Sequence, residues 1–144
     1  MLINYAQSDI YRLVAKKIMP VLKRCSIFTL EGPLGAGKTT LVKEIFKQAG
    51  IVDPVTSPTF GYVNTYHAGP LTLHHFDLYR IQSLETFIDA GLEELIEQNH
   101  AISFIEWPEI ITELLENFEH QGSVCHIKIG YDLSDIKKRT ISID

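Results

Sequence analysis

The sequence is poor in the features that mark secreted and membrane proteins. It holds only two cysteines, Cys25 and Cys125, which lie far apart and in no metal-binding spacing. We therefore expect free thiols rather than a disulfide or a zinc site. No stretch is apolar for long enough to span a bilayer, and the first residues form neither a basic region nor an apolar run. These absences predict a soluble cytoplasmic protein with no membrane contact.

Positive charge is also scarce. The chain has 13 lysines and arginines against 18 aspartates and glutamates, and its formal net charge is -5 at pH 7. Direct binding to a nucleic-acid backbone draws its affinity from basic side chains that neutralise phosphates. We therefore expect any contact with RNA to be indirect, through a partner. No repeat, low-complexity stretch or linker divides the 144 residues, which predicts one domain over residues 1–144.

The spacing of apolar residues predicts alternating helices and strands. Residues 8–24 show helical periodicity with a kink or break at Pro20, and short apolar runs predict buried strands at 26–30 and 101–105. The other expected elements are helices at 39–49, 83–88, 92–98 and 108–118, strands at 60–67, 71–79, 124–131 and 139–143, and an extended loop at 53–60. This order predicts an α/β fold: a mostly parallel sheet with helices on both faces and antiparallel edge strands.

Residues 32–39, Gly32-Pro33-Leu34-Gly35-Ala36-Gly37-Lys38-Thr39, match the pattern G-x-x-x-x-G-K-[ST] between a predicted strand and a predicted helix. The glycines let backbone N–H groups converge on phosphate oxygens, and the positive end of the following helix points to the same place. Lys38 can reach the outer phosphates, and the Thr39 hydroxyl suits magnesium. A Gly-rich turn with an exposed lysine is the ordinary alternative, which the strand and helix on either side disfavour.

This loop predicts a reduced P-loop NTPase fold that binds ATP with Mg²⁺. The expected nucleotide contacts are Gly35, Ala36, Gly37, Lys38, Thr39 and Thr40. P-loop proteins also place an acidic residue near the metal, at the end of a neighbouring strand. Asp77 and Glu106 each end an apolar strand. For either one alone a solvated carboxylate is the ordinary alternative, but together they form a candidate site for metal and water.

Other residues near these motifs leave alternatives open. Residues 56–59 could form a switch that senses the γ-phosphate, although a proline-rich connector is equally compatible with the pattern. His74 and His75 point to opposite faces of a strand, so they cannot serve one metal and are interpreted as structural. Trp107 could pack in the core or meet a partner. The basic cluster at 137–139 is interpreted as a solvated turn, although Arg139 could approach a nucleotide.

Four segments together carry a family resemblance. They are Glu31-Gly32 with residues 34–40, Ser57-Pro58-Thr59-Phe60, His75-Phe76-Asp77-Leu78-Tyr79-Arg80, and Glu106-Trp107-Pro108. In their order and spacing the sequence closely resembles the TsaE (YjeE) family, the bacterial ATPase of the tRNA threonylcarbamoyladenosine pathway. The resemblance runs from the first helix to the final strands and is far more specific than a P-loop alone.

The resemblance implies an ATPase that assists the TsaD and TsaB proteins, which place a threonylcarbamoyl group on the adenosine next to the anticodon of tRNA. It implies that Thr39 and Glu106 hold magnesium, that Asp77 supports the metal or the attacking water, and that Thr59 lies in the switch loop. It also implies that Ser8 lies near the adenine of the nucleotide. One departure is Pro33, which stands where the family usually has an acidic residue and has no N–H to offer a phosphate.

Three other functions compete with this interpretation. A small P-loop kinase that phosphorylates a metabolite usually needs a lid with arginines, whereas this chain has four scattered arginines. A GTPase would carry an Asn-Lys-x-Asp segment, which does not occur in the sequence. A binding module could use ATP only as a structural ligand, and it would show no turnover. Because no complete arginine finger is evident, we expect hydrolysis to be slow until a partner completes the site.

Overall fold

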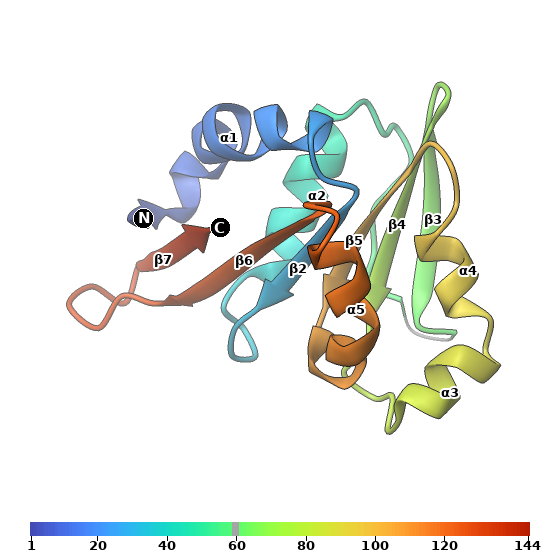
Figure 1. Cartoon of the computed structure of the whole chain (residues 1–144). Helices are drawn as coiled ribbons and strands as arrows, with labels where there is room; N and C mark the ends of the chain where they lie inside the picture. The colour runs from blue at the N-terminus through green and yellow to red at the C-terminus, as the bar shows by residue number, and fades with distance from the viewer. Residues whose placement is uncertain (59–60) are drawn as a thin grey trace.

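A seven-stranded mixed sheet organises the molecule (Figure 1). The computed structural model describes residues 1–58 and 61–144, so the predicted switch residue Thr59 lies outside the described residues. Across the sheet the strands follow the order β1 (Leu2–Ala6), β7 (Lys138–Ile143), β6 (Val124–Tyr131), β2 (Ile27–Glu31), β5 (Ala101–Glu106), β4 (Leu71–Asp77) and β3 (Val63–Ala68).

The four central strands, β6, β2, β5 and β4, are parallel. Antiparallel strands flank them, with β7 and β1 at one edge and β3 at the other. Short turns join β3 to β4 and β6 to β7, and such connections pair strands antiparallel. The parallel centre and antiparallel edges agree with the prediction. The sheet as a whole is mixed rather than mostly parallel, because three parallel pairings are matched by three antiparallel ones.

Helices cover both faces of the sheet, as predicted (Figure 1). The helices are α1 (Ile10–Leu13), α2 (Lys38–Gln48), α3 (Leu84–Asp89), α4 (Leu92–Ile96) and α5 (Thr112–Glu119). One apolar cluster lies between the sheet and the layer of α1 and α2. A second lies between the opposite face and the layer of α3, α4 and α5. Strands buried on both faces read as continuous apolar runs, which is why the central strands were readable in the sequence.

Alternate side chains of the central strands supply the two clusters. Phe28 on β2 and Phe104 on β5 stack with ring centroids 4.8 Å apart, and Phe46 of α2 meets Phe104 edge-on at 5.2 Å. Their neighbours Ile27 and Ile105 face the second cluster. This two-residue alternation fixes which side chains at the strand ends face α2.

The predicted helix at 8–24 is a continuous helical segment whose hydrogen-bonding pattern changes along its length. A 3₁₀ turn at Gln7–Asp9 leads into α1, a π-helical turn follows at Val14–Ile18, and a second 3₁₀ turn occupies Met19–Lys23. The last change includes Pro20, which lacks the N–H that a continued α-helix would use. The predicted break at Pro20 is therefore present as a change in helix type.

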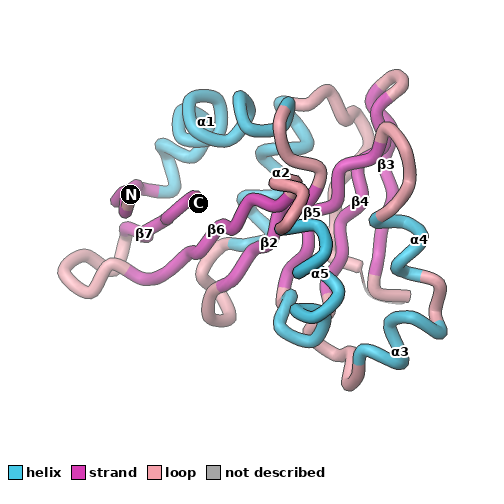
Figure 2. Tube along the Cα trace, viewed as in Figure 1, coloured by secondary structure: helices cyan, strands magenta, loops and turns pink. Residues whose placement is uncertain are grey.

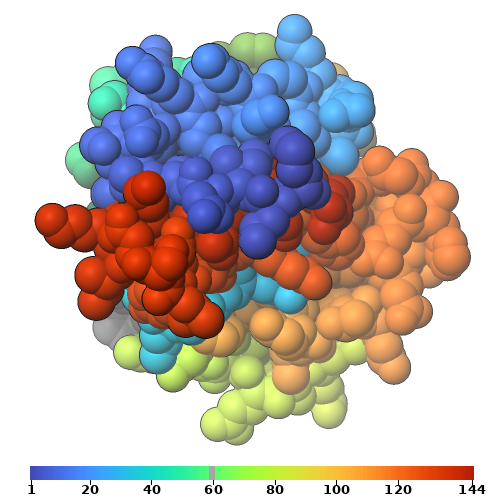
Figure 3. All heavy atoms as spheres, turned by 90° about the vertical axis from the view of Figure 1, so that its left-hand side faces the viewer, coloured from blue at the N-terminus to red at the C-terminus, as the bar shows by residue number. Residues whose placement is uncertain are grey.

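The strand β1 was missed in the sequence pattern. It adds to β7 in antiparallel register, with Ile3 opposite Ile141 and Tyr5 opposite Arg139. Figure 3 shows the N-terminal segment packed against the C-terminal strands. Only Tyr5 in this strand is fully buried, so the apolar signal is too weak to predict an edge strand.

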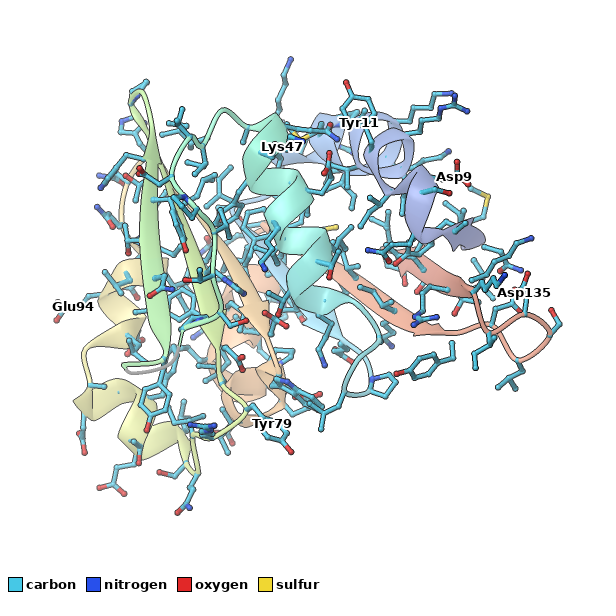
Figure 4. All side chains as sticks on the ribbon, turned by 180° about the vertical axis from the view of Figure 1, so that it is seen from behind. Asp9, Tyr11, Lys47, Tyr79, Glu94 and Asp135 are labelled. Carbon is cyan, nitrogen blue, oxygen red and sulfur yellow. The ribbon has the colours of Figure 1, made fainter. Side chains whose placement is uncertain are left out.

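The carboxyl ends of the parallel strands lie together at one end of the sheet. Figure 2 shows the loops after β2, β4 and β5 at this end, and α2 runs from there toward Lys47 at the opposite end (Figure 4). In open α/β sheets, ligands bind at the carboxyl ends of the strands. Within residues 1–58 and 61–144, no helix combines the length and apolar character that a membrane span requires.

Candidate functional site

The loop at 32–37 follows β2 and begins α2, and its bends require glycine. Gly32 has φ 156°, and a Cβ built there would lie 2.3 Å from the Ile129 carbonyl oxygen. Gly37 precedes the first residue of α2 with φ 107°, in the left-handed region that side chains rarely adopt. The Pro33 carbonyl accepts a hydrogen bond from Ala36 N at 3.2 Å. Pro33 therefore takes part in a turn that needs no N–H from it.

Two residues near the C-terminus support the outside of this loop. The Tyr131 hydroxyl donates to the Leu34 carbonyl at 2.8 Å. The Arg139 guanidinium lies over the Tyr131 ring, 4.6 Å from its centroid. Arg139 thus supports the loop indirectly, by packing on Tyr131, and is not simply a solvated turn residue. The link joins positions 97 apart in the chain, and no local sequence signal announces it.

The charged end of Lys38 contacts the glycine loop and the Trp107 ring. Its side chain is only 5% exposed, its Nζ donates to the Gly32 carbonyl, and Nζ lies 3.5 Å from the Trp107 ring centroid. Burial lowers the pKa of Lys38, while the nearby carboxylates of Glu106, Glu109 and Asp77 oppose that shift. The ammonium therefore lies at the pocket wall among carboxylates, the Gly32 carbonyl and the Trp107 ring.

Thr39 and Glu106 meet directly. The Thr39 hydroxyl lies 3.0 Å from both carboxylate oxygens of Glu106 and donates toward them. The contact follows from topology, because β2 and β5 are neighbours with Leu30 opposite Glu106, and α2 starts just after β2. Ser57 from the proline-rich segment donates to the Thr39 hydroxyl oxygen at 3.5 Å. The structure thus brings together the two residues predicted to hold magnesium.

The two histidines of β4 have different surroundings. They lie on opposite faces, as the alternation predicts. His74 forms side-chain hydrogen bonds with Thr65 and Gln98, both at 2.8 Å, which fits a structural role. The His75 ring is fully buried, and its Nε2 lies 2.5 Å from Glu106 Oε2. The interpretation of His75 as merely structural overlooked this contact, because it depends on β4 lying beside β5.

Asp77 lies beside Glu106 in strand register but is held differently. Its Oδ1 accepts a hydrogen bond from Tyr79 N at 3.1 Å. Burial raises the pKa of Asp77, and the Glu106 charge adds to that shift, while the Tyr79 bond, His75 and Lys38 oppose it. Tyr79 also packs on Trp107 with ring centroids 4.9 Å apart, at the end of the sheet where the parallel strands finish (Figure 4).

Trp107 turns the chain sharply after β5. Its backbone has φ 58° and ψ 58°, a left-handed conformation that is uncommon for a residue other than glycine and costs free energy. Pro108 then begins a 3₁₀ turn at Pro108–Ile111 that leads into α5. The turn lays the half-buried indole beside Lys38, which makes Trp107 part of the site wall.

These residues line a pocket of about 240 Å³. Its walls are Leu34, Gly35, Gly37, Lys38, Thr39, Thr40, Asp77, Glu106 and Trp107. A second pocket of about 230 Å³, lined by Ser57, Pro58, Tyr62, Asp77, Tyr79 and Arg80, shares the Asp77 wall. Nearly all the described residues predicted from the sequence to bind nucleotide or metal therefore meet in one place.

Two predicted nucleotide contacts are not in the pocket wall. Ala36 is buried inside the loop. Ser8 is exposed in the turn before α1, and its place near the adenine stays a prediction. In the part of the chain that the structure describes, no cluster of three or more His, Cys, Asp or Glu side chains could hold a metal. A P-loop site needs fewer protein ligands, since Mg²⁺ keeps waters and phosphate oxygens around it.

Comparison with known proteins decides the family. Residues 5–141 match the model of the family described as threonylcarbamoyl adenosine biosynthesis protein TsaE. The chain belongs to the TsaE family. The TsaE protein of Rickettsia conorii, named for tRNA threonylcarbamoyladenosine biosynthesis, is 43% identical over 131 residues, which cover 90% of this chain and 70% of that protein. The TsaE protein of Bacillus subtilis is 38% identical over 104 residues, covering 72% and 64%.

A solved structure shows the same fold. The crystal structure of Bacillus subtilis YdiB matches with a TM-score of 0.62 over 99% of this chain and 84% of that one, at 24% identity. The resemblance seen in the sequence motifs is therefore confirmed at the level of family and fold. The glycine loop, the end of β4 and the end of β5, which carried that resemblance, are the walls of the pocket.

Proposed function

We propose that this chain is the ATP-binding and ATP-hydrolysing subunit of tRNA threonylcarbamoyladenosine biosynthesis, acting in the cytoplasm with the TsaD and TsaB proteins. The observation that carries the proposal is the hydrogen bond between Thr39, just after the glycine loop, and Glu106, in a chain of the TsaE family. The strand, loop and helix around that contact support a P-loop NTPase fold.

The residues present fit a nucleotide and a hard cation. Gly35 and Gly37 have φ of 77° and 107°, and nothing lies within 4 Å of a Cβ added at Gly37 apart from its own chain neighbours. The N–H groups in the first turn of a helix such as α2 have no partner within the helix, so they can meet phosphate oxygens. A hydroxyl and a carboxylate are the oxygen donors that Mg²⁺ prefers. Thr39 and Glu106 would hold the ion, and Asp77 would support it or the attacking water.

Catalysis would rest on position and charge. Magnesium bound there would supply positive charge beside the transferring phosphoryl group. Lys38 would leave the Trp107 ring and bind phosphate oxygens, while the loop amides fix their orientation. Asp77, half-buried and open to both pockets, would hold the attacking water in line.

The proposal includes slow turnover by the isolated protein. Among the described residues, Arg80 is the one arginine in the walls of these two pockets, and it lines the pocket that contains Ser57, not the one that contains Lys38. An arginine that neutralises transition-state charge raises hydrolysis strongly in related NTPases. A partner that supplies such a group, or that reorders the predicted switch from residue 56 onward, would complete the site. The acidic net charge supports tRNA contact through the partners rather than directly.

The test is the ATP hydrolysis rate with Mg²⁺, measured for the purified chain alone and with TsaB and TsaD from the same host. A marked rise with the pair, abolished by Lys38→Ala, is the expected result. Transfer of phosphate to a small metabolite would point instead to a kinase. Binding of ATP without turnover under any condition would point to a module that uses ATP as a structural ligand.

A further inference from the structure

His75 is a fully buried group that the proposed chemistry leaves unused. It lies on β4 opposite Phe104 of β5, and the Phe46 ring meets its imidazole edge-on with centroids 6.3 Å apart. Its only hydrogen-bond partner among the described residues is Glu106, with Nε2 2.5 Å from Oε2. Glu106 is 3% exposed, so water has little access to satisfy either group.

The unpartnered ring nitrogen settles which atom carries the proton. Nδ1 of His75 is buried and has no hydrogen-bond partner in the described part of the chain. A buried N–H without an acceptor costs folding free energy, so the tautomer with hydrogen on Nδ1 is disfavoured. The hydrogen therefore belongs on Nε2, where it is donated to Glu106 Oε2.

This bond decides the orientation of the Glu106 carboxylate. Thr39 approaches both carboxylate oxygens at 3.0 Å and could follow the group as it rotates, whereas the His75 ring is fixed by β4 and by Phe46. Hydrogen-bonded partners behind a metal-binding carboxylate orient it and raise the metal affinity of the site. We propose that His75 is a positioning residue, which donates from Nε2 to Glu106 and sets that carboxylate for divalent-cation binding.

The inference rests on the proposed function, and its test separates the two. The affinity for Mn²⁺, a paramagnetic substitute for Mg²⁺, is measured by electron paramagnetic resonance in the presence of saturating ADP, on the full-length chain. ADP affinity is measured separately with EDTA present. For His75→Leu we expect Mn²⁺ affinity to fall about 10-fold to 100-fold, with the metal-free ADP affinity unchanged.

Three further variants control for packing. In His75→Gln the side-chain amide can reach the place of the imidazole Nε2, so Mn²⁺ affinity should stay within about 3-fold of wild type. In His75→Asn the amide is too short to reach Glu106, so affinity should fall as in the leucine variant. His74→Leu removes an equally buried histidine from the same strand and two hydrogen bonds. It should lower stability without changing Mn²⁺ affinity.

Two results would overturn the inference. One is wild-type Mn²⁺ affinity in His75→Leu, or, if that variant does not fold, equal affinities in the asparagine and glutamine variants. The other comes from the unmodified protein: a long-range ¹H–¹⁵N spectrum that places the hydrogen of His75 on Nδ1 alone. If wild-type protein shows no divalent-cation dependence of nucleotide binding, the proposed function fails instead.

Discussion

The ends of β5 and β4 carry two carboxylates in direct strand register, yet their surroundings differ. Glu106, on the inner of the two strands, is nearly buried and is contacted by Thr39 from one side and His75 from the other. Asp77 is half-buried, and its carboxylate accepts a hydrogen bond from the backbone N–H of Tyr79, two residues along the chain. Side chains that bind metal ions are held rigidly by supporting contacts, whereas a carboxylate that orients an attacking water must be accessible to solvent. On the proposed function, this difference suits Glu106 to the cation and Asp77 to the attacking water.

Loss of the Glu106 carboxylate should have the largest effect. Glu106→Gln keeps the shape but removes the charge that the proposed cation needs. We expect ATP hydrolysis in the presence of TsaB and TsaD to fall by about 10²-fold to 10³-fold, and the Mg²⁺ concentration required for half-maximal rate to rise. A steady-state rate measured across a Mg²⁺ titration checks both. An unchanged Mg²⁺ requirement would remove Glu106 from the cation site.

Loss of the Asp77 carboxylate should affect turnover without affecting the cation. Asp77→Asn keeps an oxygen that can accept from Tyr79 N but cannot draw a proton from water. We expect hydrolysis to fall by about 10²-fold, with the Mg²⁺ requirement unchanged. If Asp77→Asn shifts the Mg²⁺ titration as far as Glu106→Gln does, the two carboxylates share one role and the comparison fails.

The contrast between these carboxylates was only half visible in the sequence. The glycine loop, Asp77 and Glu106 were predictable because each depends on a local pattern: a fixed spacing, or an acidic residue ending an apolar run. The contact between His75 and Glu106 spans 31 positions and exists because β4 lies beside β5. Strand order is set by packing across the whole sheet, so no window of sequence contains it.

The same reasoning explains the other features that the pattern did not reveal. Tyr131 supports the loop through Leu34 only because β6 lies beside β2 and ends near the loop. The strand β1 is a short edge strand with one fully buried side chain, so it lacks the alternation that predicts strands. The mixed character of the sheet follows from β1 and the two hairpins together, and each adds an antiparallel pairing.

Lys38 shares a pocket with the two carboxylates, and Trp107 offers a way to observe it. Trp107 is the only tryptophan in the chain, and the Lys38 ammonium rests on its ring. A cation–π contact as buried as this one is worth about 2 kcal/mol, and we expect the charge of a bound phosphate to outweigh it. We therefore expect the emission of Trp107 to change when ADP binds, as Lys38 moves away.

The matched variant is Lys38→Met, which fills similar space without the charge. At ADP concentrations that saturate the variant, the emission of Trp107 should change much less than in wild type. An equal change in both proteins would mean that the nucleotide, and not the movement of Lys38, alters the indole environment.

On stability the two carboxylates should act in opposite directions, and the stability change from Asp77→Asn should be the smallest effect of all. Because burial raises the pKa of Asp77 in the folded state above its ordinary value of 3.8, the folded chain binds its proton more tightly than the unfolded chain. This site favours folding most below pH 3.8, and the contribution is lost as pH rises through the raised pKa. Asp77→Asn should therefore stabilise the protein at pH 7 by at most about 0.5 kcal/mol, with the gain vanishing toward pH 3.8.

Glu106→Gln should destabilise the protein at pH 7 by about 1–3 kcal/mol, because charge-assisted bonds to Thr39 and His75 are weakened. Urea unfolding of both variants at several pH values checks the signs, and destabilisation by Asp77→Asn at pH 7 would show that Asp77 is held as firmly as Glu106.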